Sequence, residues 1–399
     1  MTAAIYLDHA ATTPVDPDVR AAMLPFLTEH FGNPSSVHAA GRAARAAVDA
    51  ARDRLAAVLD CAQREIVFTG SGSEADNLAL RGALERHGAD AGRHLVVSAI
   101  EHDAVLETAG RLQETGAAEV TVVPCDPSGV VEPAAVAEAV RDDTLLVSVM
   151  LVNNETGVIQ DVAALAAAAR ERKPTVLVHT DAVQGLGRLQ VHPHQLGVDL
   201  LSLSAHKVYG PQGVGALWVR HGVNVAAAVT GGGQERNRRS GTENVAGVVG
   251  FAAAAALADQ LRAEEMSRQR ALCDQLRHAV RAAVPDAVIT GDDARRAGGF
   301  ATFAFYDVRT DLLLALLDEA GIYASGGSAC ASGAPTPSHV LTAMGLAPEL
   351  AAGALRCTVG RATTSDHAAT AGRAIAAAVE RLRASARAGS RQAEVGAHL

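Results

Sequence analysis

The stretch that decides the fold is Leu200-Leu-Ser-Leu-Ser-Ala-His-Lys-Val-Tyr-Gly210, in which an apolar run ends in small polar residues and Lys207 follows. Burying an ammonium group is costly unless something compensates for it. A lysine that must attack a carbonyl benefits from such a setting, because desolvation frees the amine. Ser204 and His206 add donors suited to a phosphate. Together these residues suggest pyridoxal phosphate (PLP) held on Lys207, with a lysine that only snorkels from a strand end as the alternative.

Alternating strands and helices lead up to this stretch. Apolar, β-branched runs predict strands, and the segments between them predict helices. This alternation indicates an α/β fold with a mainly parallel, seven-stranded-type sheet covered by helices. Ligands of such sheets bind beyond the carboxyl ends of the strands. The polar residues that follow the predicted strands are Ser73, His102, Asn154, Asp181 and Lys207.

The sequence pattern changes after Pro285, where it indicates short strands that alternate with helices. This pattern predicts a smaller α+β domain. We predict a large domain over residues 16–264 and a small domain formed by residues 1–15 and 265–385. Residues 386–399 are predicted to be a disordered tail. Small polar residues and prolines predict loops with little regular structure over 5–38, and the glycine- and arginine-rich segment 231–244 is predicted to be a flexible basic loop.

Composition excludes several classes of protein. The chain has 399 residues, is 49% hydrophobic and carries a net charge of −9, which argues against a general nucleic-acid-binding surface. We see no signal peptide and no apolar run long enough to span a bilayer. Five cysteines at scattered spacings, without a Cys-x-x-Cys pair, indicate neither a metal site nor a disulfide framework. We therefore expect a reduced, cytoplasmic enzyme without membrane contact or direct nucleic-acid binding.

Three residues that follow strands could serve a PLP ring. Asp181 could pair with the pyridine nitrogen and keep it protonated, or it could be an ordinary helix N-cap. Gln184 lies three residues further on, close enough to reach a ring substituent. His102 could stack on the ring and move protons, or it could be a hydrogen-bonded histidine at a strand end.

Two other residues could bind a carboxylate. Asn154 lies in the polar patch Val152-Asn-Asn-Glu-Thr-Gly157 and could contact the cofactor or a substrate, although Asn-Asn is also typical of a turn. Arg356 has apolar neighbours and therefore needs an anionic partner. That partner is either an amino-acid carboxylate held by a bidentate clamp or a structural salt bridge.

Two segments remain. The turn Gly70-Ser-Gly-Ser73 between a strand and a helix could bind an anion through backbone amides and the helix dipole, with Ser73 as N-cap or phosphate donor; an ordinary βα connection is the alternative. Cys330 lies in a segment of glycines and small residues that ends in prolines, which suggests a mobile loop and a reactive thiol. Cys61, Cys125, Cys273 and Cys357 lie in or beside regular elements and are expected to be inert.

Taken together, these motifs resemble the cysteine desulfurases of the NifS/IscS type, a class V aminotransferase group of PLP enzymes with fold-type I. The matching stretches run in the family's order from residue 6 to about 365. They are Tyr6-Leu-Asp-His-Ala-Ala-Thr-Thr-Pro14, Phe31-Gly-Asn-Pro34, Glu65–Asn77, Val152–Gly157, Asp181–Gln184, Ser204–Pro211, Gly231–Arg236, Arg239-Ser-Gly-Thr242, Gly327-Ser-Ala-Cys330, Leu355-Arg356 and Gly360-Arg361.

The resemblance implies a role for each candidate residue. Lys207 would be the Schiff-base lysine, Asp181 the partner of the pyridine nitrogen, His102 the stacked ring neighbour and Gln184 a neighbour of the ring oxygen. Cys330 would take sulfur as a persulfide. The phosphate would be bound by Gly72, Ser73, Ser204 and His206, with Thr242 reaching across from the second subunit of a homodimer, and the substrate carboxylate by Asn154 and Arg356.

The chain departs from the family's pattern at two places. The phosphate turn reads Ser-Gly-Ser-Glu where many relatives have Gly-Ala-Thr-Glu, and the loop of the thiol reads Ala-Cys-Ala-Ser where Ala-Cys-Thr is usual. The first departure keeps the amide and the hydroxyl. The second keeps the thiol, although it could alter how the thiol is presented.

The implied reaction converts L-cysteine to L-alanine and leaves a persulfide on Cys330. Rival hypotheses are a selenocysteine lyase, another class V enzyme such as an aminotransferase, and a sulfur-relay scaffold that has lost catalysis. The sulfur acceptor stays open, since iron–sulfur cluster assembly, tRNA thiolation, cofactor synthesis and DNA phosphorothioation all use enzymes of this kind.

Overall fold

The computed structural model describes residues 4–327 and 338–396, and its largest element is a seven-stranded sheet. The strand order is β2-β8-β7-β6-β5-β3-β4, and only β8 runs antiparallel to its neighbours. This confirms the predicted mainly parallel sheet. The strands are β2 (Ile66–Thr69), β3 (His94–Ser98), β4 (Glu119–Val123), β5 (Thr144–Ser148), β6 (Leu177–Asp181), β7 (Leu200–Ser204) and β8 (Gly215–Val219).

Helices cover both faces of this sheet because alternate strand residues point to opposite sides. In β8, Leu217 packs with the buried side chains of α4 and α5, whereas Trp218 packs with those of α3, α7 and α10 on the other face. The helices of this part of the chain are α1 (Pro17–Met23), α2 (Pro25–Thr28), α3 (Ala39–Leu59), α4 (Gly72–Ala91), α5 (Asp103–Glu114), α6 (Pro133–Ala139), α7 (Val162–Arg172), α8 (Pro193–Leu196) and α9 (Gln234–Asn237).

A second hydrophobic core is formed by residues after 265 together with Ile5 and Leu7, around two small sheets. In the first, β10 pairs antiparallel with both β9 and β12; in the second, β1 pairs parallel with β11. The N-terminal segment thus joins this smaller part of the fold. Its elements are β1 (Ile5–Tyr6), β9 (Val288–Ile289), β10 (Phe300–Ala304), β11 (Ile322–Tyr323), β12 (Ala354–Thr358), α11 (Thr310–Glu319), α12 (His339–Ala343), α13 (Pro348–Ala351) and α14 (Ser365–Gly396).

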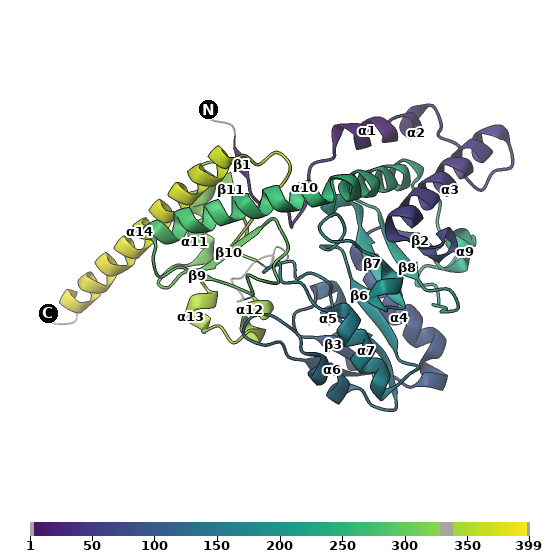
Figure 1. Ribbon diagram of the computed structural model, residues 1–399, viewed down its shortest axis with the longest axis horizontal. Helices are drawn as coiled ribbons and strands as arrows, with labels where there is room; N and C mark the ends of the chain where they lie inside the picture. Colours follow the sequence, from purple (N-terminus) through teal and green to yellow (C-terminus); the bar gives the residue numbers. More distant parts are fainter. Residues whose placement is uncertain (1–3, 328–337, 397–399) are drawn as a thin grey trace.

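The 39-residue helix α10 (Val245–Ala283) connects the two parts, and Figure 1 shows it running from the large sheet to the small sheets beside α14. Its first half buries Phe251 in the large core, and its second half buries Leu276 in the small one. The predicted boundary between residues 264 and 265 falls within this continuous helix, so the division into two domains stays a prediction.

One prediction about apolar length was wrong. Among the described residues, α10 is long and apolar enough to pass the length and composition test for a membrane span. More than half of its apolar window is buried, however, and the helix packs against α3 and α14. Its apolar residues therefore form core contacts.

Two predictions about loops and termini were also wrong. Residues 5–38 contain β1, α1 and α2, because Asp16 caps α1 and Pro17 and Pro25 begin its two helices. The segment 231–244 is a loop apart from the four residues of α9, and Glu235 and Arg236 within α9 have non-helical backbone angles. The predicted disordered tail is helical as far as Gly396, since α14 continues through alanines, arginines and a glutamate that favour helix. Figure 1 shows this end of α14 projecting past the other elements.

Candidate active site

A cavity of about 270 Å³ lies beyond the carboxyl ends of β6 and β7. Side chains from the N-terminal segment, the large sheet and the small part of the fold all line it. The structure brings together almost all the residues that the sequence singled out: Gly72, Ser73, His102, Asn154, Asp181, Gln184, Ser204, His206, Lys207 and Arg356.

One of the predicted residues that the structure describes does not line this cavity. Thr242 is exposed on the chain, and its predicted contact with a second subunit stays a prediction. Cys330 lies outside the described residues, which end at Gly327 and resume at Ser338.

Lys207 is placed by a strand that ends abruptly. All five residues of β7 are buried, and the short 3₁₀ turn Ala205–Lys207 follows directly. The Nζ atom of Lys207 donates hydrogen bonds to the carbonyl oxygens of Ala10, at 2.7 Å, and Ala11, at 2.8 Å. The N-terminal segment therefore fixes the amine against the cavity wall.

The turn after Lys207 is also fastened to this N-terminal segment. Tyr209 has a φ of 67°, a left-handed conformation that is unusual for a residue other than glycine, and its amide donates to the Thr13 hydroxyl at 2.8 Å. The same hydroxyl donates to the carbonyl oxygen of His206 at 2.8 Å. Burial and the charge of Lys207 lower the pKa of His206 to about 4, so its ring is neutral at pH 7.

Asp181 is the last residue of β6, and its carboxyl group is buried. Its Oδ1 atom accepts a hydrogen bond from the amide of Val183 at 2.8 Å. Burial raises the pKa of Asp181, whereas the charges of His102 and Lys207 oppose that shift. A buried carboxyl group that faces a cavity is a suitable partner for a cationic ring nitrogen.

The predicted anion site lies at the start of α4, although its N-cap is Ser71 and not Ser73. The hydroxyl of Ser71 accepts from the amide of Glu74 at 3.0 Å, which leaves the exposed Ser73 in the first turn. Gly72 packs closely: a Cβ atom there would lie 2.9 Å from Val183 and 3.2 Å from Ser204. A side chain at position 72 would therefore crowd Val183 and Ser204.

His102 is the N-cap of α5 and is hydrogen-bonded, which agrees with the second of its two predicted readings. Its Nδ1 atom accepts the amide of Ala104 at 3.0 Å, which fixes the ring while the side chain lines the cavity. The capping and cavity-lining roles are thus compatible.

Arg356 makes the structural salt bridge that was one of its two predicted alternatives, and its contact with a substrate carboxylate stays a prediction. It is buried in β12, and its Nη2 atom donates to the carboxylate of Asp8 at 2.8 Å, so the structural salt bridge exists. Its Nη1 atom donates to the backbone oxygens of Asn154, at 2.9 Å, and Gly327, at 3.1 Å. Its Nε atom has no partner among the described residues, so this donor is available to a ligand.

Unpaired polar atoms converge on the cavity, which is the main evidence that it binds a polar ligand. Buried polar groups in folded proteins almost always have hydrogen-bond partners, and exceptions need an explanation. Within the described part of the chain, five buried atoms without a partner belong to residues that line this one cavity: Asp76 Oδ1, Asn154 Oδ1, Gln184 Oε1, Ser204 Oγ and Arg356 Nε. The donor and acceptor set fits PLP together with an amino-acid carboxylate.

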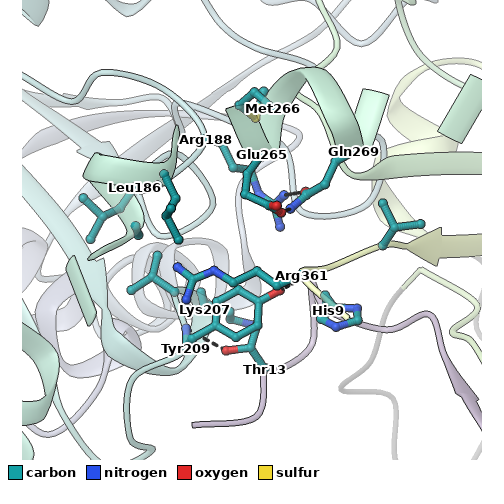
Figure 2. A pocket seen from close by; sticks show the side chains of 15 residues that line it. His9, Thr13, Leu186, Arg188, Lys207, Tyr209, Glu265, Met266, Gln269 and Arg361 are labelled. Carbon is teal, nitrogen blue, oxygen red and sulfur yellow. Dashed lines mark hydrogen bonds between the residues drawn. The ribbon is translucent and has the colours of Figure 1, made fainter. Parts of the chain in front are cut away.

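A smaller cavity, of about 30 Å³, lies on another side of Lys207 (Figure 2). It has room for about one or two water molecules and is too small for PLP. Figure 2 shows the guanidinium group of Arg361 lying over the ring of Tyr209, and the distance to the ring centre is 4.1 Å. The contact between Arg361 and Tyr209 therefore stabilises the turn that follows Lys207.

Two buried acidic residues near Asp181, Asp76 and Glu101, were not identified from the sequence. Asp76 lines the cavity, and burial and the neighbouring Asp181 raise its pKa well above the usual range. His179 lies 3.6 Å from Asp76, but burial lowers the pKa of His179 to about 3, so the ring supplies no positive charge at pH 7. An acidic residue on the apolar face of α4, next to Ala75 and Leu78, was the available signal for Asp76.

Glu101 should make the stability of the fold depend on pH. It is fully buried, and burial raises its pKa from 4.5 to about 8 despite hydrogen bonds from Ser98 and Met150. Between these two values the unfolded chain releases the proton while the folded chain keeps it. The contribution of Glu101 to stability is therefore full below about pH 4.5 and is lost as the pH rises towards 8, by about 1.4 kcal/mol per pH unit.

Replacing Glu101 with glutamine removes this titration. We compare the free energy of unfolding of Glu101→Gln with that of the parent chain at each pH. The variant should be more stable relative to the parent at pH 7.5 than at pH 5, by about 2 kcal/mol or more. Urea unfolding at the two pH values measures it. An equal difference between variant and parent at both values would show that Glu101 is ionised in the folded protein.

The four cysteines that the structure describes are free thiols, and none suits a nucleophilic role. Burial raises the pKa of Cys61 and of Cys273 to about 12, and it also raises the pKa of Cys125 and Cys357. A thiol is nucleophilic as its thiolate, which these environments disfavour. This agrees with the prediction that they are inert.

Comparisons with known proteins agree with this geometry. The sequence model of the family described as aminotransferase class-V matches residues 5–369. A relative named "Cysteine desulfurase IscS" from Dictyoglomus turgidum is 42% identical over 365 residues, which are 91% of each chain. A solved structure titled "NIFS-LIKE PROTEIN" superimposes with a TM-score of 0.89 at 35% identity and covers 94% of this chain and 99% of its own. Another, titled "SspA in complex with cysteine", has a TM-score of 0.77 at 33% identity and covers 89% and 98%.

The fold and the site define a PLP-dependent enzyme of fold-type I, and the chain belongs to the class V aminotransferase family. Within that family it groups with the cysteine desulfurases of the NifS/IscS type. The resemblance that the sequence motifs indicated is thereby confirmed.

Proposed function

We propose that this chain converts L-cysteine to L-alanine and retains the sulfur as a persulfide on Cys330. The observation that carries the proposal is the convergence of unpaired polar atoms around Lys207 and Asp181 in one cavity. The relative titled "SspA in complex with cysteine" binds the proposed substrate, which supports the assignment.

The residues that would hold PLP divide into three groups. Lys207 would carry its reactive carbon, and Asp181 would face its ring nitrogen, with His102 and Gln184 beside the ring. Its phosphate would be bound at the start of α4 and the end of β7, by Gly72, Ser73, Ser204 and His206. When bound, PLP withdraws electrons from the α-carbon of an attached amino acid.

The substrate carboxylate would be bound by Arg356 and Asn154. Arg356 has a free Nε donor and is already anchored by Asp8, so binding a carboxylate costs little side-chain ordering. Lys207 is then positioned to take the α-proton on its Nζ atom.

The thiolate of Cys330 would next attack the sulfur of the substrate. A new S–S bond forms and the Cβ–S bond of the substrate breaks. The electron pair stays on the carbon skeleton, which takes up protons and leaves as alanine. Cys330 follows Gly327 by three residues in the sequence, and the carbonyl oxygen of Gly327 accepts from Arg356 at 3.1 Å.

A comparison of substrates tests this function. Purified protein loaded with PLP should release alanine from L-cysteine with a reductant present to regenerate the thiol, and it should not transfer an amino group to an oxo acid. A rate on selenocysteine that exceeds the rate on cysteine by a large factor would favour the selenocysteine lyase alternative. Turnover of amino donors without sulfur release would contradict the proposal.

We further propose a homodimer, in which Thr242 of each chain completes the phosphate site of the other, and a separate protein as the sulfur acceptor. The exposure of Thr242 on the single chain supports the first point. The free thiols of the four described cysteines support a reducing compartment such as the cytoplasm.

A further inference from the structure

Glu155 occupies an unusual position beside the candidate site. It follows Asn154 in the polar turn after β5, lines the cavity and is only 4% exposed. The turn is fixed by the side chain of Asn153, whose Oδ1 atom accepts from the amides of Glu155, at 3.0 Å, and Thr156, at 2.8 Å. A buried carboxyl group is costly, so its contacts need a reason.

One of these contacts is with Ser338, the first described residue after the segment 328–337. The hydroxyl of Ser338 donates to Glu155 Oε2 at 2.5 Å and accepts from the amide of Leu341 at 3.1 Å. Ser338 is thereby the N-cap of α12. Glu155 thus contacts the residue that caps α12, the first helix described after this segment.

The same carboxyl group packs against Gly327, the last described residue before the segment. A Cβ atom at Gly327 would lie 2.7 Å from Glu155 Oε2, and the φ of +104° also favours glycine. Gly327 is further held by Arg356, and the neighbouring Ser325 exchanges two backbone hydrogen bonds with Arg356 at 3.1 and 2.7 Å. A single oxygen atom of Glu155 therefore meets both ends of the segment that carries Cys330.

We propose that Glu155 is a positioning residue for sulfur transfer: it packs against Gly327 and accepts the hydrogen bond of Ser338, the two described residues that flank the segment of Cys330. The proposal deepens the proposed function and rests on it. Arg356 connects Gly327 with the proposed substrate site, since it donates to the carbonyl oxygen of Gly327 and its Nε atom has no partner among the described residues. The substrate clamp and the start of the Cys330 segment are thereby fixed to the same guanidinium group.

A variant series separates positioning from cofactor binding. Glu155→Ala removes both contacts, and we expect it to bind PLP with the visible absorbance of the parent enzyme and an affinity within about twofold. The rate of the first alanine formed, measured in a single turnover, should fall by about 10²-fold, because small displacements of a reacting group have effects of that size. Glu155→Gln keeps an oxygen and the shape, and it should recover most of the rate.

The matched control is Glu101→Gln. Glu101 is also a buried carboxyl group that accepts a 2.5 Å hydrogen bond from a serine, but it does not contact Gly327 or Ser338. It should leave the rate and Cys330 reactivity unchanged. A second readout needs no turnover: the alkylation rate of Cys330 by iodoacetamide, followed by peptide mass spectrometry, should change several-fold in Glu155→Ala alone.

Gly327→Ala supplies an independent test, because its added methyl group should displace the Glu155 carboxyl group. Its effect should be clearly smaller in the Glu155→Ala background, where that group is absent, so the two changes should not be additive. If Glu155→Ala fails to fold or to bind PLP, Ser338→Ala must still slow the first turnover. This variant removes the hydrogen bonds of the Ser338 hydroxyl with Glu155 and with the amide of Leu341, but it leaves Glu155 packed against Gly327. The proposal would be overturned if Glu155→Ala had the single-turnover and alkylation rates of the parent enzyme. If Glu155→Ala does not fold or bind PLP, the same rates in Ser338→Ala would overturn it. Absence of alanine formation by the parent enzyme would instead contradict the proposed function.

Discussion

Lys207→Ala is expected to abolish alanine formation from L-cysteine, with a loss of about 10³-fold or more. The structure supports this because the Lys207 amine is fixed on the cavity wall by the carbonyl oxygens of Ala10 and Ala11. Another lysine cannot replace it, since Lys173, the other lysine of the chain, donates to the carbonyl oxygens of Ala91 and Thr144 at the opposite end of the sheet.

The measurement has two parts. The visible absorbance of protein incubated with PLP reports the attachment to Lys207, and an alanine assay reports turnover. Lys207→Ala should lose both, whereas Lys173→Ala is a matched control that should keep both. A variant that lacks Lys207 but keeps the parent absorbance and rate would show that the amine has been assigned to the wrong residue.

Cys330→Ser is expected to keep the PLP absorbance and to lose alanine formation from cysteine. A hydroxyl group is a far weaker nucleophile than a thiolate towards sulfur, so a loss of about 10²-fold or more is expected. The unchanged absorbance follows because the residues proposed to hold PLP all lie outside the segment 328–337.

Cys61→Ser and Cys125→Ser are the controls for this prediction, since both thiols are partly buried with raised pKa values. They should retain the parent rate. Full turnover by Cys330→Ser would mean that sulfur leaves without this thiol. A loss of absorbance would mean instead that the substitution disturbs the cofactor site.

The strands and most of the site could be predicted from the sequence because their signals are local. Apolar runs with polar residues at their ends predict both the sheet and the edge at which ligands bind, and Asp181 and Lys207 lie where that rule places them.

Contacts between distant segments could not be predicted in this way. The carbonyl oxygens that hold Lys207 come from Ala10 and Ala11, and the carboxylate that anchors Arg356 comes from Asp8, almost 350 residues away in sequence. Such partners depend on the pairing of β1 with β11, and both strands are only two residues long. Strands this short have no periodicity to detect.

The basic loop 231–244 shows how tertiary contacts override composition. Glycines and arginines predict flexibility, but Glu235, Arg236 and Asn237 all adopt left-handed φ values, between 48° and 62°. The carboxylate of Glu235 is held by both terminal nitrogens of Arg52, at 2.8 and 2.6 Å, and by the amide of Phe68, at 2.9 Å. A buried bidentate ion pair can hold a backbone conformation that local sequence disfavours.

The most direct test of the sulfur-transfer claim is peptide mass spectrometry after one turnover. The enzyme with PLP is mixed with L-cysteine in the absence of reductant, quenched with an alkylating agent and digested. One sulfur atom should be added to the peptide that contains Cys330, in step with one alanine per active site. Alanine formed in that amount with no sulfur on Cys330, or with the sulfur on another cysteine, would contradict the account.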